Sequence, residues 1–390
     1  MSERCPVSDW NPIDPATFAD YPSEFRRLRG ECPVAYSDAL GGFWSLLTYD
    51  HIAAACKDPS TFSSEPQFSV PHLDIGVPWL PIQSDPPRHA TYRKALASYL
   101  GTKRVKSLEP AMRDLARKRI DALRGKTAFD AAAEFTMPYP GEVLCMALGF
   151  PEEHWEKFRS WTTGIAEAAS TGDMELLQGV VADLFSWVAE EVEVRKQHPG
   201  DDLMSTLLAL DVDGRPLTLD EMRGYYFLLT SAGHDTSSNS LGQALLHLAQ
   251  HPEDRRRLLE EPELVPGAVE EIIRYYSPLL GLGRQATRDV ELGGREIKKG
   301  DPVALVWGAA ARDDTYVADA DQFVLDRKPY RHISFGLGSH YCVGAELGRS
   351  QLKVAVEEFL ETFPDFSVDG DVARTIWPTN GIRALPLSIG

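Results

Sequence analysis

A segment near the C-terminus concentrates residues that could do chemistry around a single cysteine: His332 to Gly344 reads HISFGLGSHYCVG. Cys342 lies where a long helix is predicted to begin, and the peptide N–H groups of a helix start favour a thiolate over a thiol. Gly336, Gly338 and Gly344 remove side chains around it, so that a flat ligand can approach the backbone closely. One thiolate without a second sulfur ligand suits haem iron, which needs a single axial ligand from the protein. A buried structural cysteine in a glycine-rich turn is the simpler alternative.

The same segment resembles the haem-binding loop of the cytochrome P450 family of haem-thiolate monooxygenases, through the pattern Phe335-x-x-Gly338-x-His340-x-Cys342-x-Gly344. The resemblance implies that the cofactor is haem b, iron protoporphyrin IX, with Cys342 as the axial ligand of the iron. It also implies that a set of loop residues surrounds the haem: Phe335, Gly336, Gly338 and Gly344.

A second motif, Glu271-Ile-Ile-Arg274, places an acid and a base three residues apart on one helix face. On its own it is consistent with a surface ion pair, which stabilises a helix by about 0.2–0.5 kcal/mol. In the P450 family such a pair locks with an arginine ahead of the haem cysteine, and Arg327 occupies the matching place here. The resemblance implies that these three residues hold the cysteine loop and take no part in catalysis.

The middle of a long predicted helix contains Ala232-Gly-His-Asp-Thr236-Ser237, in which glycine, serine and threonine are poor helix formers. Their hydroxyls compete for backbone carbonyls and can bend a helix. One interpretation is a helix break, with Asp235 as the N-cap of a second helix. The resemblance implies instead a groove over the haem for the co-substrate O2, with Asp235 and Thr236 as catalytic acid and alcohol. Cleavage of the O–O bond requires protons delivered into a water-poor pocket. Ser237 stands where many relatives have a second threonine.

Four basic residues match the positions at which the family binds the haem propionates. His89 and Arg93 are four residues apart and therefore lie on one helical face, and Arg284 and His332 match two further contacts. Carboxylates held against a protein wall require charge-assisted donors. Each residue taken singly is better explained as a solvated surface charge, whereas all four at family positions indicate propionate contacts.

The family's substrate recognition segments fall on apolar and aromatic stretches of this chain, which are typical of small-molecule pockets. Core packing would give the same composition. The candidate pocket residues are Phe68, Trp79, Leu229, Gly233, Leu280, Leu282, Ile376 and Trp377. They predict a small-to-medium hydrophobic substrate.

These residues must be positioned by a helix-rich scaffold. Helices are predicted from Asp85, as N-cap, to about Leu100, from the capping box Thr218-x-x-Glu221 to about Gln250, and up to a stop before Pro364. Short strand signals lie at 34–47 and 290–306, each around a pair of glycines. The expected fold class is mainly α with small β-sheets (α+β). The resemblance spans roughly residues 10–388, which implies a single P450 catalytic domain over 1–390 with a minor β-rich region.

The whole chain has 390 residues and a formal charge of −18, from 40 Lys+Arg and 58 Asp+Glu. This acidic balance argues against nucleic acid and anionic membranes as partners, since both are bound by basic faces. No stretch approaches the ~18 apolar residues that span a bilayer, and the N-terminus lacks an apolar signal core. The five cysteines include no Cys-x-x-Cys pair, so no zinc or iron–sulfur cluster is predicted. We expect a cytoplasmic monomer of the soluble bacterial type.

Together these features predict a monooxygenase that inserts one oxygen atom from O2 into its substrate, by hydroxylation or epoxidation. Because the sequence shows no flavin domain and no iron–sulfur motif, electrons are expected from NAD(P)H through a ferredoxin or flavodoxin and a separate reductase. A local basic cluster near the implied haem face is either a docking site for such a partner or a solvated patch: Arg88, Lys94, Lys103, Arg104 and Lys106.

Three other functions remain open at the level of sequence. In a peroxygenase driven by H2O2 the relatives replace the acid–alcohol pair, which is present here. A non-catalytic haem protein or gas sensor has no need of proton delivery. A cysteine hydrolase, with Cys342 as nucleophile and His340 as base, leaves the Glu271–Arg274 motif and the long helix unexplained.

Overall fold

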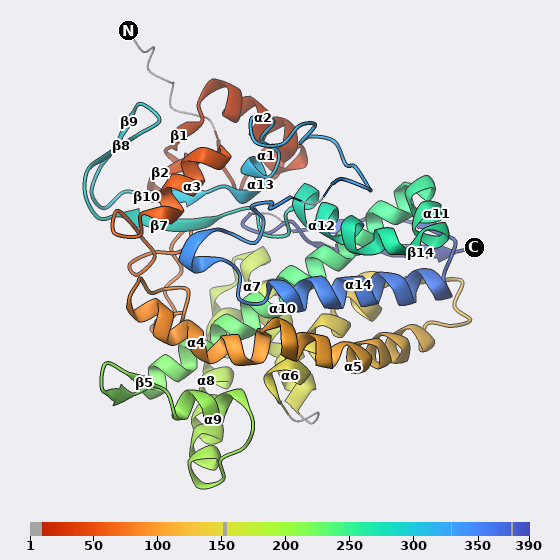
Figure 1. The fold of residues 1–390 in the computed structure, drawn as a ribbon, viewed down its shortest axis with the longest axis horizontal. Helices are drawn as coiled ribbons and strands as arrows, with labels where there is room; N and C mark the ends of the chain where they lie inside the picture. Colours follow the sequence, from red (N-terminus) through yellow and green to blue (C-terminus); the bar gives the residue numbers. More distant parts are fainter. Residues whose placement is uncertain (1–9, 151–153, 329, 376) are drawn as a thin grey trace.

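The longest element of the computed structural model is helix α10 (Leu219–Gln250), which crosses the middle of the molecule (Figure 1). Its start is fixed by the predicted capping box. The Thr218 hydroxyl accepts from the Glu221 peptide N–H at 3.2 Å, and the Glu221 carboxylate accepts from the Thr218 N–H at 2.7 Å. The helix ends before Pro252, where α11 begins. The prediction of this helix is confirmed, and the helix runs unbroken through residues 232–237.

The structure describes residues 10–150, 154–328, 330–375 and 377–390, and these form a mainly helical fold with small sheets, as predicted. The other α-helices are α1 (Pro15–Ala19), α2 (Tyr21–Glu31), α3 (Tyr49–Lys57), α4 (Arg88–Leu100), α5 (Thr102–Asp121), α6 (Pro138–Leu148), α7 (Trp155–Thr171), α8 (Met174–Gln197), α9 (Leu203–Leu208), α11 (Pro252–Glu260), α12 (Val265–Tyr276), α13 (Trp307–Ala310) and α14 (Ala345–Thr362). Within the described part of the chain, no helix combines the length and the hydropathy that crossing a bilayer requires.

The strands are short and gather mostly beside the N-terminal helices, on one side of the molecule (Figure 1). A five-stranded sheet has the order β1-β2-β10-β7-β3 and a three-stranded sheet the order β11-β14-β4. The hairpins β1–β2 and β8–β9 lie at the two predicted glycine pairs, whose residues all have positive φ. The strand bounds are β1 (Val34–Ser37), β2 (Phe43–Leu46), β3 (Phe62–Ser63), β4 (Ala128–Asp130), β5 (Asp211–Val212), β6 (Arg215–Pro216), β7 (Leu282–Ala286), β8 (Val290–Leu292), β9 (Arg295–Ile297), β10 (Pro302–Leu305), β11 (Phe366–Val368), β12 (Ala373–Arg374), β13 (Ile382–Ala384) and β14 (Pro386–Ile389).

Helix α14 packs against α5, α10 and α12, so the last long helix lies beside the longest one. Its buried face includes Leu352, Ala355, Val356 and Phe359, which recur at the spacing of three to four residues that puts side chains on one helix face. The helix ends at Thr362, before Pro364, as predicted. The loop that carries Cys342 leads directly into its first turn, and α10 and α14 become two walls of one site.

The start of α4 differs from the prediction, because Asp85 is not its cap. The Asp85 carboxylate accepts hydrogen bonds from the Ser64 N–H at 3.0 Å and from the Ser63 hydroxyl. Helix α4 begins at Arg88 and has no side-chain cap. The carboxylate instead ties the approach to α4 to strand β3, a contact that local sequence rules do not anticipate.

Candidate functional site

A cavity lies between α10 and the loop that precedes α14. Its volume is about 240 Å³. Helix α10 presents Leu229, Gly233, Thr236 and Ser240 to it, at a spacing of three to four residues that places them on one face. Ala232 is exposed although it lies in mid-helix, because its exposed surface opens onto this cavity.

The loop across from α10 presents Cys342 to the same cavity. The Cys342 N–H donates to the Phe335 carbonyl at 2.8 Å, and the loop turns at Gly336 and Gly338, whose φ values of 73° and 68° suit glycine. Phe335, Gly336 and Gly344 line the cavity, as predicted for a bound flat ligand. Gly338 lies outside the cavity lining, and a Cβ there would meet the Cys56 carbonyl of α3 at 2.8 Å.

The Cys342 side chain is accessible only because it opens onto the cavity, deep inside the protein. Burial raises the pKa of the Cys342 thiol, while the Gly344 N–H and the Arg93 guanidinium act in the opposite direction. The backbone N–H at the helix start therefore favours the thiolate, as predicted, but burial outweighs it. A coordinated metal cation removes the proton of a thiol outright. A metal bound in the cavity would therefore convert the Cys342 thiol to the thiolate.

A wall of basic side chains closes one end of the cavity. His89 and Arg93 come from α4, Arg284 from β7 and His340 from the cysteine loop. The rings of His89 and His340 are 4.1 Å apart. Burial, helped by Arg93, lowers the pKa of His89 to about 4, and burial, helped by Arg284, lowers that of His340 to about 2.

These four basic side chains have no carboxylate partner within ion-pair distance among the described residues. The Arg284 guanidinium, which is buried, makes one hydrogen bond, to the Gly283 carbonyl at 2.6 Å. Buried cations in proteins are normally paired. The wall therefore fits a ligand that brings its own carboxylates, such as the propionates of haem, and the thiol of Cys342 faces the same space. His340 belongs to the cysteine motif, but the sequence did not indicate that it would join these basic side chains.

His332, the remaining predicted propionate contact, is placed differently. Its Nε2 lies 3.0 Å from Glu270, whose carboxylate also accepts from Arg349 at 2.5 Å. Burial would raise the pKa of Glu270, but the hydrogen bonds from His332 and Arg349 outweigh it and lower that pKa to about 2. His332 does not line the cavity, although its Nδ1 is buried without a partner among the described residues. No pattern in the sequence indicated Glu270 or Arg349.

Glu271, Arg274 and Arg327 form one buried cluster beneath the cysteine loop. The Arg274 guanidinium donates twice to the Glu271 carboxylate, at 2.7 Å each, and Arg327 Nε donates to both of its oxygens at 3.1 Å. Arg274 also donates to the carbonyls of Ala311 and Ala320. The side chains of the first two residues are 2% and 0% exposed, which rules out the surface-pair alternative. The cluster fixes α12 to the chain that leads into the cysteine loop.

The structure separates the predicted acid and alcohol. Thr236 lines the cavity, and its hydroxyl donates to the Ala232 carbonyl at 2.9 Å. Asp235 does not line it, because the next residue of a helix points about 100° away. Its carboxylate instead accepts from Arg383 at 2.8 Å and from Asn239 at 2.9 Å. The helix-break alternative is excluded, since α10 continues through this segment.

Only part of the predicted substrate pocket lines the cavity: Leu229, Gly233 and Leu282 do. Phe68 and Trp79 pack in the core, with Trp79 4.4 Å from the ring of Phe227. Leu280 and Trp377 belong to a separate cluster around Trp10, where the Trp377 indole donates to the Val70 carbonyl at 2.6 Å. Ile376 lies outside the described residues. The structure thus places Phe68, Trp79, Leu280 and Trp377 outside the cavity lining, and apolar residues of a core and of a pocket look alike in sequence.

The cavity wall contains further residues that the sequence did not single out. Gln351 of α14 donates to the Ser237 hydroxyl of α10 at 2.8 Å, which bridges the two helices. Its Oε1 is buried without a partner among the described residues. Apolar side chains supply most of the remaining lining: Ile82, Leu96, Leu100, Leu144, Leu228, Leu279 and Trp307.

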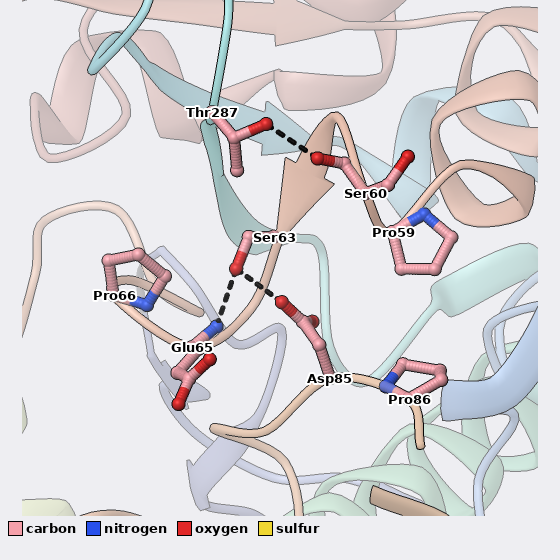
Figure 2. A pocket seen from close by; sticks show the side chains of 8 residues that line it. All are labelled: Pro59, Ser60, Ser63, Glu65, Pro66, Asp85, Pro86 and Thr287. Atoms are coloured by element: carbon pink, nitrogen blue, oxygen red, sulfur yellow. Dashed lines mark hydrogen bonds between the residues drawn. The ribbon is translucent and has the colours of Figure 1, made fainter. Parts of the chain in front are cut away.

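A second pocket lies beside the start of α4 (Figure 2). Its lining residues are Pro59, Ser60, Ser63, Glu65, Pro66, Asp85, Pro86 and Thr287. The polar groups bond to one another, since Ser63 pairs with Asp85 and the Thr287 hydroxyl donates to the Ser60 carbonyl (Figure 2). It holds neither a thiol nor a basic side chain, so the chemistry belongs to the first cavity.

Comparisons with known proteins agree with this geometry. A family model described as Cytochrome P450 matches residues 166–382. The chain is 33% identical to cytochrome P450 130 of Mycobacterium tuberculosis, over 94% of this chain and 93% of that protein. It is 31% identical to the methyl-branched lipid omega-hydroxylase of the same species, over 93% and 90%. Among solved structures, cytochrome P450 CYP268A2 of Mycobacterium marinum, in complex with pseudoionone, superposes with a TM-score of 0.89 at 27% identity, over 98% and 100%.

Proposed function

This chain belongs to the cytochrome P450 family and is a monooxygenase of the haem-thiolate type, and on that premise we propose that haem b binds in the cavity between α10 and the loop of Cys342. The Cys342 thiolate would hold the haem iron, in a single catalytic domain. The observation that carries this proposal is the convergence on one cavity of one thiol and four basic side chains that have no carboxylate partner among the described residues. When bound, the haem supplies activation of O2 and transfer of one oxygen atom to the substrate.

The protein's own part begins with holding the cofactor. Arg93 and Arg284 donate charge-assisted hydrogen bonds to carboxylates. His89 and His340, whose pKa values burial lowers, would donate ring N–H groups to the same carboxylates. Gly336 and Gly344 leave room for a flat ring, and the Glu271 cluster keeps the loop of Cys342 in register. As the ligand of the iron, the Cys342 thiolate would supply electron density to it.

Proton delivery is assigned to Thr236 and Asp235. The Thr236 hydroxyl can exchange the Ala232 carbonyl for a water in the cavity, and so hold a proton donor beside the substrate. Asp235 lies on the adjacent side of α10, 17% exposed at its side chain, and can pass protons from solvent toward that hydroxyl. General acid–base groups contribute roughly 10²–10⁴-fold to rate.

The substrate proposed is a compact hydrophobic molecule, oxidised by hydroxylation or epoxidation. Support comes from the apolar lining of the cavity, in which Leu229, Leu279 and Leu282 occur together with Thr236. One similar protein is named as a hydroxylase of a methyl-branched lipid, and another was solved in complex with pseudoionone; both compounds are largely hydrocarbon. Such a site binds through buried apolar area and excludes water.

Electrons are proposed to come from NAD(P)H through a ferredoxin or flavodoxin and its reductase. Lys94, Lys103, Arg104 and Lys106 are exposed on α4 and at the start of α5, close in sequence to the cofactor-binding Arg93. Arg88 is not part of this basic surface, because it pairs with Asp213 at 2.6 Å. Exposed cations steer an acidic partner into contact.

The test is turnover of a panel of hydrophobic compounds with a surrogate ferredoxin, its reductase and NAD(P)H under ¹⁸O2. Compounds are first selected by the spin-state shift that they cause on binding. The proposal expects one ¹⁸O atom in the product. Product that carries no ¹⁸O from O2, but carries label from H2¹⁸O2 supplied without NAD(P)H, would make this protein a peroxygenase instead.

A further inference from the structure

The carboxylate of Asp235 is held from two directions. One oxygen accepts from Arg383 Nη2 at 2.8 Å, and the other accepts from Asn239 Nδ2 at 2.9 Å, one helical turn further along α10. The side chains of Arg383 and Asp235 are 22% and 17% exposed, so the ion pair is largely shielded from solvent. A carboxylate with both oxygens occupied has a fixed orientation, and here that orientation is away from the cavity.

Arg383 is brought to this position by a segment that docks along one face of α10. Gln243 donates to the Asn380 side chain at 3.1 Å, and Gly381 packs so closely on Asn239 that a Cβ there would collide with it. Ile382 occupies the space that Gly242 leaves, since a Cβ on that glycine would lie 2.9 Å from it. On α10 these contacts recur at i, i+4, i+7 and i+8 from Asp235, which is one helical face. The register of the docked segment therefore sets Arg383 opposite Asp235.

The other end of the docked segment reaches the cavity wall. Thr379 forms a β-bridge with Leu279, which lines the cavity, and the Asn380 N–H donates to the Pro278 carbonyl at 3.0 Å. This stretch of chain thus contacts both the cavity lining, at Leu279, and the Asp235 carboxylate that is assigned to proton delivery. Residues 379–383 are the link between the two.

We propose that Arg383 is a positioning residue for proton delivery. It holds the Asp235 carboxylate in one position beside α10, so that protons reach Thr236 through Asp235 and not through mobile water. The proposal rests on the proposed function. Loss of the arginine frees the carboxylate and loosens the docked segment, so reducing equivalents are lost as H2O2. The expected loss of product per NAD(P)H is about threefold, the scale of one partly exposed ion pair.

The experiment compares Arg383→Gln, Arg383→Lys, Asp235→Asn and the double variant Arg383→Gln/Asp235→Asn, each loaded with haem. Product, H2O2 and NAD(P)H consumption are measured together, and urea unfolding of the same variants gives a readout independent of turnover. Arg195→Gln, which breaks an ion pair with Asp202 whose side chains are 18% and 9% exposed, is the matched control.

The proposal expects Arg383→Gln to lower product per NAD(P)H with unchanged NAD(P)H consumption, Arg383→Lys to restore most of it, and the double variant to be no worse coupled than Asp235→Asn. In the double-mutant cycle of unfolding free energies, the effects of the substitutions at positions 235 and 383 should not be additive. Unchanged coupling efficiency in Arg383→Gln, or losses that multiply in the double variant, would overturn it. If the reduced CO spectrum of the unsubstituted protein lacks the thiolate signature, the proposed function fails, whereas a normal spectrum with unchanged coupling rejects the role of Arg383 alone.

Discussion

Thr236 and Asp235 are neighbours in the chain, yet one faces the cavity and the other an arginine from the C-terminal strand region. Substitutions at the two positions should therefore fail differently. Thr236→Ala should still consume NAD(P)H and O2, but most oxygen should leave as H2O2, because the hydroxyl that holds the proton donor is gone. Asp235→Asn should slow the reaction by ~10²–10⁴, the usual scale for a general acid–base group, with a larger solvent isotope effect.

The measurement is NAD(P)H consumption, product and peroxide in the same samples with a true substrate. Ser231→Ala is the control, because that hydroxyl also bonds to its own helix, at 3.0 Å from the Phe227 carbonyl, but does not line the cavity. Normal coupling in Thr236→Ala together with a normal rate in Asp235→Asn would reduce this stretch of α10 to an irregularity without a catalytic role.

Arg284 offers a second test at the scale of one residue. Burial lowers the pKa of its guanidinium, and its one hydrogen bond goes to the Gly283 carbonyl. Arg284→Leu should leave the apoprotein as stable or more stable, because an unpaired buried charge is removed. It should accelerate haem loss about 10–100-fold, the equivalent of one charge-assisted hydrogen bond.

Haem transfer to an excess of apomyoglobin measures the loss rate, and urea unfolding of the apoprotein measures stability. Arg288→Leu, in the segment after β7, is the control, since this arginine is mostly exposed and does not line the cavity. Haem loss from Arg284→Leu at the rate of the unsubstituted protein would separate Arg284 from the cofactor.

Among the elements, α10 carries the site, and its first turn depends on Glu221. Burial would raise the pKa of this carboxyl, but hydrogen bonds from Arg215, the Thr218 N–H and Tyr92 lower it to about 2. A pKa below the value of the unfolded chain contributes stability that is complete above about pH 4.3 and is lost as the pH falls toward 2. Glu221→Gln should therefore cost about 1 kcal/mol at pH 7 and flatten stability against pH below 4.3.

Urea unfolding of the apoprotein at several pH values between 2 and 7 checks this expectation. Asp220→Asn is the control in the same helical turn, where the side chain is mostly exposed. An unchanged pH dependence in Glu221→Gln would show that the capping box does not anchor α10.

The elements that the sequence predicted are those whose signals are local. The capping box of α10 and the glycine pairs of the two hairpins are readable within a few residues, and all are confirmed. The prediction that Asp85 caps a helix failed because its carboxylate accepts hydrogen bonds from Ser63 and Ser64, which lie more than 20 positions earlier in the chain. The pairing of Asp235 with Arg383 spans 148 positions, and no local pattern announces it. The cysteine motif succeeded because its spacing is specific, whereas apolar residues such as Trp377 do not reveal whether they face a core or a pocket.

The whole molecule is acidic, with a formal charge of −18, so a local basic surface stands out against it. If Lys94, Lys103, Arg104 and Lys106 receive the electron donor, Lys103→Glu/Lys106→Glu should slow reduction of the haem by a ferredoxin roughly tenfold at low salt. The effect should shrink as ionic strength rises, because surface charges are screened within about 10 Å at 0.1 M.

Stopped-flow reduction across a salt series measures this rate. Lys196→Glu on α8, which reverses an exposed charge far along the chain from α4 and α5, is the control. Equal reduction rates in Lys103→Glu/Lys106→Glu and in Lys196→Glu would show that the basic cluster is a solvated patch and not a docking site.

The visible spectrum of the reduced protein with CO shows whether Cys342 supplies a thiolate to haem iron in the cavity between α10 and the cysteine loop. The unsubstituted protein should show a strongly red-shifted Soret band, because thiolate donates electron density to the iron. Cys342→Ser should lose that band, while Cys56→Ser, which changes another free thiol beside the loop, should keep it. A red-shifted band that persists in Cys342→Ser, or its absence from the unsubstituted haem-loaded protein, would contradict the account.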